Sequence, residues 1–150
     1  MRPDIDSYFM DMARLVATRS TCIRRSVGCV LADSHNHVLA TGYNGVPAGM
    51  PHCNDDSRQY VCEGAGSPSG TNLDACSAVH AEQNAILQCI DAYAIRRAYV
   101  TAFPCTSCAK LLLNTSCAEI VYLEPYADGN GMRLWTAAGR TCRQSKIVQK

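Results

Sequence analysis

The stretch that decides the fold is "RAYVTAFPCTSCAKLLLNT", residues 97–115, in which a strand pattern runs directly into a helix pattern. Residues 97–103 are typical of a buried strand, and residues 105–115 are typical of a helix with an apolar face. Pro104 marks the junction between them. A strand that leads at once into a helix is the repeating unit of α/β folds.

Similar patterns continue on both sides of this stretch. Two short β-rich runs separated by "SHN" predict an antiparallel hairpin, and further strands then alternate with helices. This order favours an α/β sandwich with parallel neighbours after the first hairpin. The sequence predicts helices at residues 5–19, 79–87 and 131–140, hairpin strands at 27–33 and 37–43, a strand at 119–125 and an edge strand at 145–149.

Residues 44–77 form the long exception to this regular pattern. They are rich in Gly, Pro, Ser and Asp and show little periodicity, so we expect a loop. A loop of this length inside a compact domain usually carries function. The whole chain, residues 1–150, is expected to form one domain around a single core.

Composition narrows the classes of function. Hydrophobic residues make up 47% and charged residues 18%, and the net charge of +1 gives no electrostatic footprint for long nucleic acid. No apolar run has the ~18 residues that a membrane span needs, so we expect no membrane partner. The first residues, "MRPDIDSYFM", lack a signal-peptide pattern, so we expect a cytoplasmic location, which for a viral protein would be the host cytoplasm.

The ten cysteines need an explanation, because a reducing compartment disfavours disulfides and favours metal binding or catalysis. Four of them lie within apolar patterns and are expected to be small buried hydrophobic residues: Cys29, Cys89, Cys117 and Cys142.

Two other cysteines, Cys105 and Cys108, stand at the expected start of a helix, where free amide groups and the helix dipole favour thiolates. His80 stands at the start of another expected helix. Alone, the Cys-x-x-Cys pair could be a redox motif. Together, the three side chains supply three zinc ligands and leave a fourth position open, which is typical of catalytic zinc.

The stretch "VHAEQNAIL" places Glu82 two residues after His80, a spacing that puts the two side chains on nearly opposite sides of a helix. Both can still reach one site if that site lies over the helix N-terminus. His80 then binds the metal, and Glu82 takes a proton from the water whose pKa zinc lowers to about 7. His-x-Glu combined with Pro-Cys-x-x-Cys is the signature of zinc nucleobase deaminases.

Within that group, the chain resembles the deoxycytidylate (dCMP) deaminase family from about Tyr8 to Tyr126. The resemblance rests on "RSTCIRRSVGCV", "ATGYNGVPAGMPHC", "HAEQNAIL" and "FPCTSCAKLL", in that order. It implies a three-layer α/β/α sandwich with a mixed five-stranded sheet that starts with an antiparallel hairpin. It also implies hydrolysis of dCMP to dUMP and ammonia, which supplies dUMP for thymidylate synthesis. A homohexamer activated by dCTP and inhibited by dTTP would be expected.

The resemblance also implies roles for single residues. Zinc would be held by His80, Cys105 and Cys108, and Glu82 would be the proton carrier. Asn44 would hold the sugar hydroxyl, although Asn44-Gly45 could also be an ordinary turn. The remaining substrate contacts would be the backbone at Val79 and Ala81 and an aromatic wall at Tyr126, a residue that could equally be core or surface.

Arg24 and Arg25 precede the first hairpin strand, within plausible reach of a 5′-phosphate that a guanidinium can bind through two oxygens. We favour Arg24 over Arg25, and the alternative is a solvated surface pair. A second, structural zinc is a further hypothesis, because several soft ligands remain and three of these cysteines lie in the long loop. The candidates for it are Cys22, His52, Cys53, Cys62 and Cys76.

The glycine-rich turn "TGYNGVPAG" is the expected place for the dCTP and dTTP effectors, each arriving with magnesium on its phosphates. Glycines permit close approach and open amide groups to an anion, although they could also simply shape a turn. The residues assigned to this site are Gly42, Tyr43, Gly45 and Gly49.

Three rival functions remain open. A tRNA or polynucleotide deaminase would use the same chemistry but needs a basic stripe, and a free-nucleoside deaminase would have no use for a phosphate site. A non-catalytic, zinc-stabilised nucleotide-binding module would need neither Glu82 nor an open metal position.

Overall fold

A computed structural model describes residues 1–53, 62, 64–72 and 76–146 of the chain. A short 3-10 helix, Ala92–Ala94, precedes β3. The other elements, in chain order, are α1 (Ile5–Ala17), β1 (Gly28–Ala32), β2 (Val38–Tyr43), α2 (Ala81–Gln88), β3 (Arg97–Ala102), α3 (Thr106–Leu113), β4 (Glu119–Glu124), α4 (Asn130–Ala137) and β5 (Thr141–Gln144).

The five strands form one mixed sheet in the order β2-β1-β3-β4-β5. Strand β1 pairs antiparallel with both β2 and β3, whereas β3, β4 and β5 run parallel to one another. The predicted hairpin and the parallel neighbours after it are therefore confirmed. Parallel neighbours bring the carboxyl ends of β3 and β4 to the same edge of the sheet.

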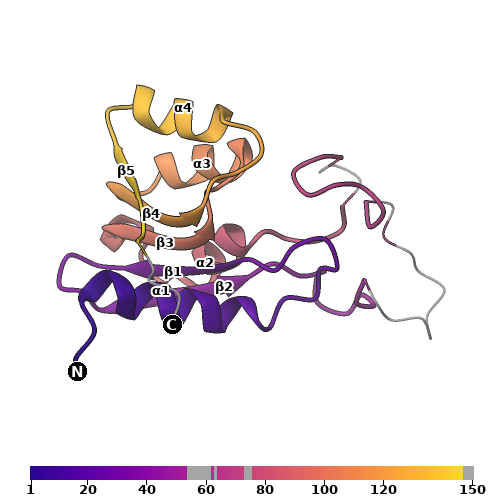
Figure 1. Ribbon diagram of the computed structural model, residues 1–150, viewed down its shortest axis with the longest axis horizontal. Coiled ribbons are helices and arrows are strands. Elements are labelled where there is room, and N and C mark those ends of the chain that lie inside the picture. The colour runs from indigo at the N-terminus through magenta and orange to yellow at the C-terminus, as the bar shows by residue number, and fades with distance from the viewer. Residues whose placement is uncertain (54–61, 63, 73–75, 147–150) are drawn as a thin grey trace.

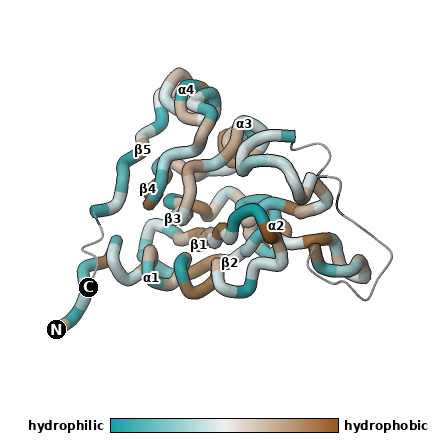
Figure 2. Tube along the Cα trace, turned by 45° about the vertical axis from the view of Figure 1, so that its right-hand side comes forward, coloured by the Kyte–Doolittle hydropathy of each residue, from teal (hydrophilic) through white to brown (hydrophobic). Residues whose placement is uncertain are grey.

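The core lies on both faces of this sheet, because side chains alternate along each strand. On β1, Val30 faces α1 and contributes to a cluster with Phe9 and Met10, whereas Cys29 and Leu31 face the opposite side. The opposite side is covered by α2, α3 and α4, so the predicted three-layer α/β/α architecture is confirmed (Figure 1). Hydrophobic residues concentrate on the central strands, and Figure 2 shows them there.

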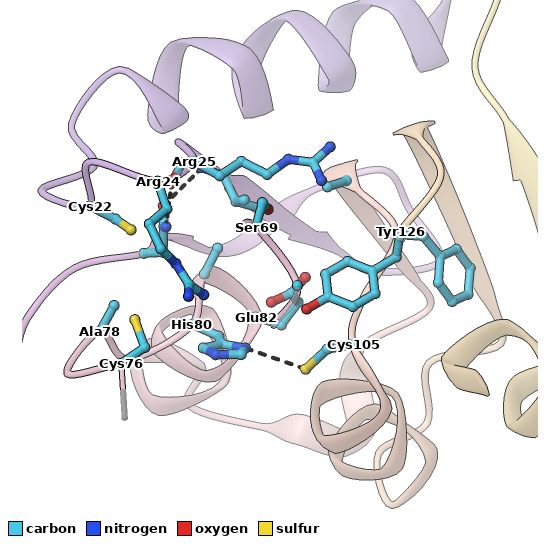
Figure 3. Close-up of a pocket in the computed structure, with 16 residues that line it drawn as sticks. Cys22, Arg24, Arg25, Ser69, Cys76, Ala78, His80, Glu82, Cys105 and Tyr126 are labelled. Carbon is cyan, nitrogen blue, oxygen red and sulfur yellow. Dashed lines mark hydrogen bonds between the residues drawn. The ribbon is translucent and has the colours of Figure 1, made fainter. Parts of the chain in front are cut away.

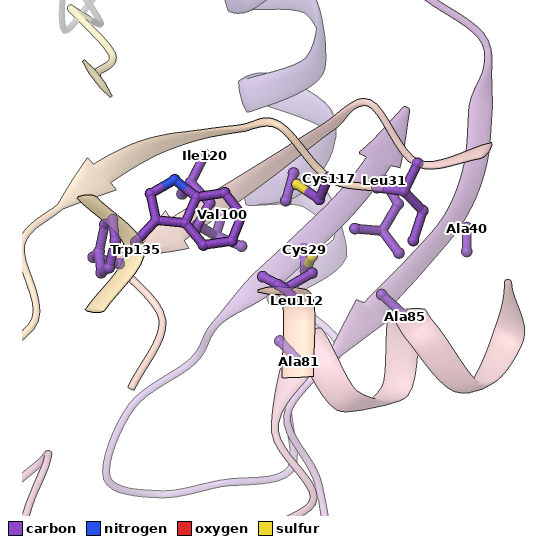
Figure 4. Packing of buried hydrophobic residues seen from close by; sticks show 13 residues of the cluster. Cys29, Leu31, Ala40, Ala81, Ala85, Val100, Leu112, Cys117, Ile120 and Trp135 are labelled. Atoms are coloured by element: carbon purple, nitrogen blue, oxygen red, sulfur yellow. The ribbon is translucent and has the colours of Figure 1, made fainter. Parts of the chain in front are cut away.

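Leu112 of α3 and Trp135 of α4 pack over this second face, as Figure 4 shows. Trp135 is fully buried and its indole N–H donates to the Thr141 carbonyl at 2.7 Å, which ties α4 to the start of β5. No helix in the described part of the chain is both long and apolar enough to cross a membrane.

The four cysteines expected to be buried divide into two pairs. Cys29 and Cys117 are fully buried in the core, as predicted. Cys89 and Cys142 are only partly buried and pack against the edge of the same cluster, because each lies at a peripheral position. No disulfide joins any of the ten cysteines, all of which lie in the described residues.

Two sequence predictions differ in position from the observed elements. The last strand, β5, is Thr141–Gln144 and follows Gly139, which lies after α4 in the left-handed region at φ +78°. Of the edge strand expected at residues 145–149, Ser145 and Lys146 are not in a strand, and residues 147–149 lie outside the described ranges. The helix expected from Val79 begins at Ala81 instead, because Val79 forms a single β-bridge with Gly45 beyond the end of β2. His80 therefore follows one bridge rather than a full strand.

Candidate metal centre and active site

Two helix N-termini meet at the candidate metal centre. His80 is the N-cap residue of α2, and Cys105 is the N-cap residue of α3, directly after β3. Cys108 lies in the first turn of α3 and is fully buried. The Gln83 side-chain carbonyl accepts from the His80 backbone N–H at 2.8 Å, which fixes the start of α2. Amide groups and positive dipole ends of both helices thus face the sulfur atoms.

Close packing of α2 on the sheet sets the position of His80. A Cβ atom on Gly42 of β2 would lie 2.2 Å from the Ala81 carbonyl oxygen and 2.4 Å from the Ala85 nitrogen. Only a glycine leaves room for this approach, so Gly42 brings the first turn of α2 against β2.

The three predicted ligands converge. His80 Nδ1 lies 3.4 Å from Cys105 Sγ and 3.3 Å from Cys108 Sγ. Zinc bonds to nitrogen and sulfur at tetrahedral angles predict a separation of about 3.5 Å between such atoms. Within the described residues, these side chains form the one group of three or more His, Cys, Asp or Glu residues whose ligand atoms lie within 4.8 Å of one another. The donor set and its spacing fit a zinc ion with three protein ligands.

The two thiols have opposed electrostatics. A hydrogen bond from Cys108 lowers the pKa of Cys105 to about 4, and His80 acts in the same direction. The same contact, together with burial, raises the pKa of Cys108 far above its usual value. The hydrogen bond to Cys105 also raises the pKa of His80. A cation in the site would replace the shared proton and satisfy both sulfur atoms as thiolates.

Glu82 lies beside His80 and Cys105, as Figure 3 shows, and lines the same pocket as they do. It is only 4% exposed. Burial raises the pKa of its carboxyl group, which disfavours the charged form and lets the group hold a proton more readily. Glu82 and His80 are two residues apart, and both reach one site because that site lies over the N-terminus of α2, as the sequence predicted.

A pocket opens directly over this centre. It is lined by Glu82, His80 and Cys105 together with Arg24 and Arg25, and Figure 3 shows Arg24 pointing toward His80. Tyr126 stands in its wall, and burial raises the pKa of the phenol to about 12. The sequence had pointed to these residues. Further lining residues that it did not single out for this pocket include Ser69, Gly70, Ala78, Ala102 and Phe103.

Asn44 also lines the pocket, but its side chain has a structural task. Its Nδ2 donates to the Arg25 carbonyl at 2.7 Å, and its Oδ1 accepts from the Val27 N–H at 2.8 Å. An amide side chain has two donors and two acceptor sites, so one of each is left for a ligand. Asn44 thereby fixes the backbone that carries both arginines.

The two arginines have different partners. Arg24 Nη1 donates to the Gly64 and Thr71 carbonyls at 3.1 and 2.7 Å, whereas Arg25 Nη2 pairs with Glu124 Oε2 at 2.6 Å. Neither is the solvated surface pair that the sequence left open, because both line the pocket.

The backbone amide groups of Val79 and Gly45 are paired with each other's carbonyls. Both the N–H and the carbonyl of Val79 bond to Gly45, at 2.7 and 3.1 Å, so the Val79 amide is not open to a base and the Gly45 amide is not open to an anion. Gly42 is buried under α2, and Gly49 is exposed with φ +88°. Ala81 lines the pocket, whereas Tyr43 lines a separate hollow with His52 and the residues after α1.

The candidates for a second zinc are close to one another without forming a complete set of ligands. Burial raises the pKa of Cys53 and of Cys76, and nearby Cys22 and Cys62 act in the same direction on both. Cys22 and Cys76 both line the pocket. His52 lies on the separate hollow. In the described part of the chain, these side chains do not reach the spacing that His80, Cys105 and Cys108 show.

Comparisons with known proteins agree with this geometry. The family described as "Cytidine and deoxycytidylate deaminase zinc-binding region" matches residues 3–124. Deoxycytidylate deaminase of Schizosaccharomyces pombe is 42% identical over 95% of this chain and 44% of its own length, and that of Saccharomyces cerevisiae is 37% identical over 100% and 47%. The chain thus spans about half the length of these two curated relatives.

Two relatives from phages match over most of their own length. Deoxycytidylate deaminase of Mycobacterium phage D29 is 39% identical over 81% of this chain and 95% of its own. The apo crystal structure of dCMP deaminase from cyanophage S-TIM5 superposes with a TM-score of 0.71 at 25% identity, covering 97% of this chain and 100% of that one. Together with the His80, Cys105 and Cys108 geometry, these matches show that the chain belongs to the cytidine and deoxycytidylate deaminase zinc-binding family.

Proposed function

We propose that this chain catalyses the hydrolysis of dCMP to dUMP and ammonia, and that residues 1–150 act as one catalytic domain. One observation carries the proposal: three ligands with zinc spacing lie beside a buried carboxyl group, at a pocket that two arginines also line. Its relatives named deoxycytidylate deaminase support the choice of substrate. The S-TIM5 enzyme has also been solved with dCMP and dUMP.

Zinc held by His80, Cys105 and Cys108 would supply a Lewis acid that lowers the pKa of a water molecule to about 7. Glu82 takes a proton from the attacking water molecule, and the oxygen of that water adds to carbon 4 of the cytosine ring. Glu82 then delivers the proton to ring nitrogen 3. It next carries the remaining proton from the hydroxyl on carbon 4 to the exocyclic amine. The bond between carbon 4 and this nitrogen then breaks, which releases ammonia and leaves the carbonyl of dUMP. The raised pKa of the buried carboxyl suits a group that must hold the proton between these steps.

The pocket also suggests how the nucleotide lies. The part of the lining that contains Arg24 and Arg25 is the proposed site for the 5′-phosphate, since a guanidinium binds phosphate through two oxygens. The donor and acceptor left on Asn44 would meet the sugar hydroxyl. Tyr126 and the backbone at Ala81 would border the base next to Glu82.

A steady-state comparison of dCMP, deoxycytidine, CMP and RNA tests the proposal. We expect dCMP to have the highest kcat/KM, because the two arginines select a phosphate and the pocket sits over the metal centre. Preference for deoxycytidine would favour a nucleoside deaminase, and turnover of RNA alone would favour a polynucleotide deaminase. If zinc-loaded protein bound the nucleotide without turning it over, the chain would be a non-catalytic nucleotide-binding module.

We also propose a second, structural zinc among Cys22, Cys53, Cys62 and Cys76, with His52 as an alternative ligand. The electrostatic effect of Cys22 and Cys62 on both Cys53 and Cys76 supports it, because it indicates that the four thiols are close to one another. Four soft ligands would tie the long loop to the segment after α1. Metal analysis of protein purified without chelator is expected to give two zinc ions per chain. One zinc ion per chain would contradict this proposal.

Regulation by dCTP and dTTP, in a homohexamer and with magnesium on each triphosphate, is a further part of the proposal. Since the Gly45 amide is already bonded, the hollow lined by Tyr43 and His52 is the better candidate for an effector than the open turn. We expect sigmoidal dCMP turnover that dTTP sharpens and dCTP straightens. Hyperbolic curves that neither triphosphate changes would contradict the proposed regulation. A monomer in analytical ultracentrifugation would contradict the proposed homohexamer. We also propose that the protein works in the cytoplasm, a reducing compartment in which cysteine thiols stay available as zinc ligands.

A further inference from the structure

One wall of the pocket comes from the long loop between β2 and α2. We refer to its described residues 64–72 as the 64–72 loop. The loop holds its own turns, in which the Ser67 N–H donates to the Gly64 carbonyl and the Thr71 N–H donates to the Pro68 carbonyl, each at 3.1 Å. Ser69, at its tip, is among the residues that surround the pocket (Figure 3). A loop without periodicity thus contributes directly to the candidate site.

Arg24 closes the base of this loop. Its Nη1 donates to both the Gly64 carbonyl at 3.1 Å and the Thr71 carbonyl at 2.7 Å, and these acceptors lie at opposite ends of the loop. Arg24 itself lies between α1 and β1, about forty residues earlier in the chain. Hydrogen bonds from a charged donor are about twice as strong as those between neutral groups. A single side chain therefore holds both ends of the loop in register with the pocket.

The tip of the loop rests on the opposite side of the pocket. Gly70 has φ +80°, and a Cβ atom there would lie 3.3 Å from the Ala127 Cβ and 3.5 Å from the Tyr126 hydroxyl oxygen. The backbone at Gly70 thus packs closely on the segment between β4 and α4. The 64–72 loop spans the pocket from Arg24 at one side to Tyr126 at the other.

We propose that Arg24 is a positioning residue for the reaction, because it holds the 64–72 loop where Ser69 and Gly70 complete the pocket wall beside Tyr126. The inference rests on the proposed deamination for its functional meaning, whereas the fixing of the loop stands on its own. The role adds to the proposed phosphate contact, since the two acceptors of Nη1 are main-chain carbonyls of the protein and neither bond uses Nη2. Loss of the Arg24 side chain opens the wall and lets water reach the base and Glu82.

Hydrogen exchange of the protein without nucleotide tests the fixing of the loop, independently of any activity. In Arg24→Ala, amides of the 64–72 loop should exchange roughly tenfold faster, as loss of a charged hydrogen bond predicts. Arg25→Ala removes a neighbouring cation that bonds to Glu124 and not to the loop, so loop exchange should match wild type. Arg133→Ala, an exposed arginine on α4, controls for loss of charge. Unchanged loop exchange in Arg24→Ala would overturn the inference.

Kinetics then separate a positioning role from a phosphate ligand. In Arg24→Ala, KM should rise on both dCMP and deoxycytidine, because the wall serves the base of either substrate. Loss on dCMP alone, with deoxycytidine turnover unchanged, would show a phosphate ligand only and overturn the positioning role. Gly70→Ala disturbs the contact between the loop and Tyr126 while the Arg24 side chain stays in place, and it should also raise KM on both substrates. Unchanged KM in that variant would likewise count against the wall. Wild-type protein inactive on both substrates would defeat the proposed deamination, yet leave the exchange result readable.

Discussion

His80 and Cys105 occupy equivalent places on two different helices: each is an N-cap residue, and His80 Nδ1 lies 3.4 Å from Cys105 Sγ. The arrangement arises because the β-bridge between Gly45 and Val79 brings the start of α2 close in space to the end of β2. Helix α3 begins at the end of β3, on the same side of the sheet. Two helix ends therefore supply ligands, dipoles and the buried Glu82 to one point.

Loss of one ligand should remove the metal. Cys105→Ala leaves His80 and Cys108 as the remaining ligands, so we expect less than a tenth of the wild-type zinc at this site and no measurable turnover. Cys142→Ala, a partly buried cysteine on β5, is the matched control and should keep both. Zinc content by mass spectrometry and dUMP formation are the measurements. A Cys105→Ala protein with full zinc and full rate would refute the assignment of this ligand.

Arg25 gives the cleaner test of the phosphate site, because an Arg24 variant also disturbs the 64–72 loop. Charge-assisted hydrogen bonds to phosphate contribute ~1.5–3 kcal/mol, so Arg25→Ala should lower kcat/KM for dCMP roughly 10- to 150-fold. Turnover of deoxycytidine should change little. Lys110→Ala, an exposed cation on α3, should leave dCMP turnover unchanged. Equal losses on dCMP and deoxycytidine would remove Arg25 from the phosphate site.

Gly42→Ala should damage both stability and metal binding. Its Cβ would meet the Ala81 carbonyl at 2.2 Å and the Ala85 nitrogen at 2.4 Å, so α2 must move away from β2. Overpacking of this kind costs about 1–3 kcal/mol in the free energy of unfolding. The same displacement moves His80, so zinc affinity should fall as well. Urea unfolding and zinc titration are the measurements, with Gly129→Ala, where no atom lies within 4 Å, as control. Normal zinc affinity would show that His80 does not depend on this packing.

The ion pair between Asp6 of α1 and Arg143 of β5 should make stability depend on acid pH. The hydrogen bond from Arg143 lowers the pKa of Asp6 below its ordinary value of 3.8 in the folded state. Its contribution is therefore complete above that ordinary value and is lost as pH falls through the lower folded pKa. We expect about 1 kcal/mol, because Arg143 is 44% exposed and water screens the pair.

Asp6→Asn removes this contribution, so the free energy of unfolding at neutral pH should fall by that amount. The difference from wild type should vanish at pH values below the folded pKa of Asp6. Chemical unfolding at a series of pH values measures it. A difference that stayed constant down to the lowest pH would show that Asp6 stabilises the fold without its charge.

The sequence predicted those parts of the molecule that local patterns encode. The strand and helix at residues 97–115 and the ligands His80, Cys105 and Cys108 follow from short motifs at element ends. The position of β5 did not, because Thr141–Gln144 is a polar edge strand with no apolar alternation. Its place depends on pairing with β4 and on the bond from Trp135 to Thr141.

The pocket wall was beyond sequence reasoning for a similar reason. Ser69 and Gly70 lie in a stretch without periodicity, and their place is set by Arg24, whose bonds reach forty residues or more along the chain. The bonds between Val79 and Gly45 are equally non-local, which is why amide groups expected to be open are in fact paired. Gly70 adopts φ +80°, a conformation that glycine favours. The glycine in the sequence could suggest a turn, but not that this turn lies against the pocket.

The most direct test of the central claim is the rate of dUMP formation from dCMP by Glu82→Gln at matched zinc content. The variant keeps the three ligands and the size of the buried side chain but cannot carry a proton. General acid–base groups contribute roughly 10²–10⁴-fold, and Glu82 serves several transfers, so we predict a loss at or beyond the upper end of that range with zinc and fold unchanged. A Glu82→Gln protein with full zinc that retained more than a tenth of the wild-type rate, well outside the roughly 10²-fold minimum, would contradict the account.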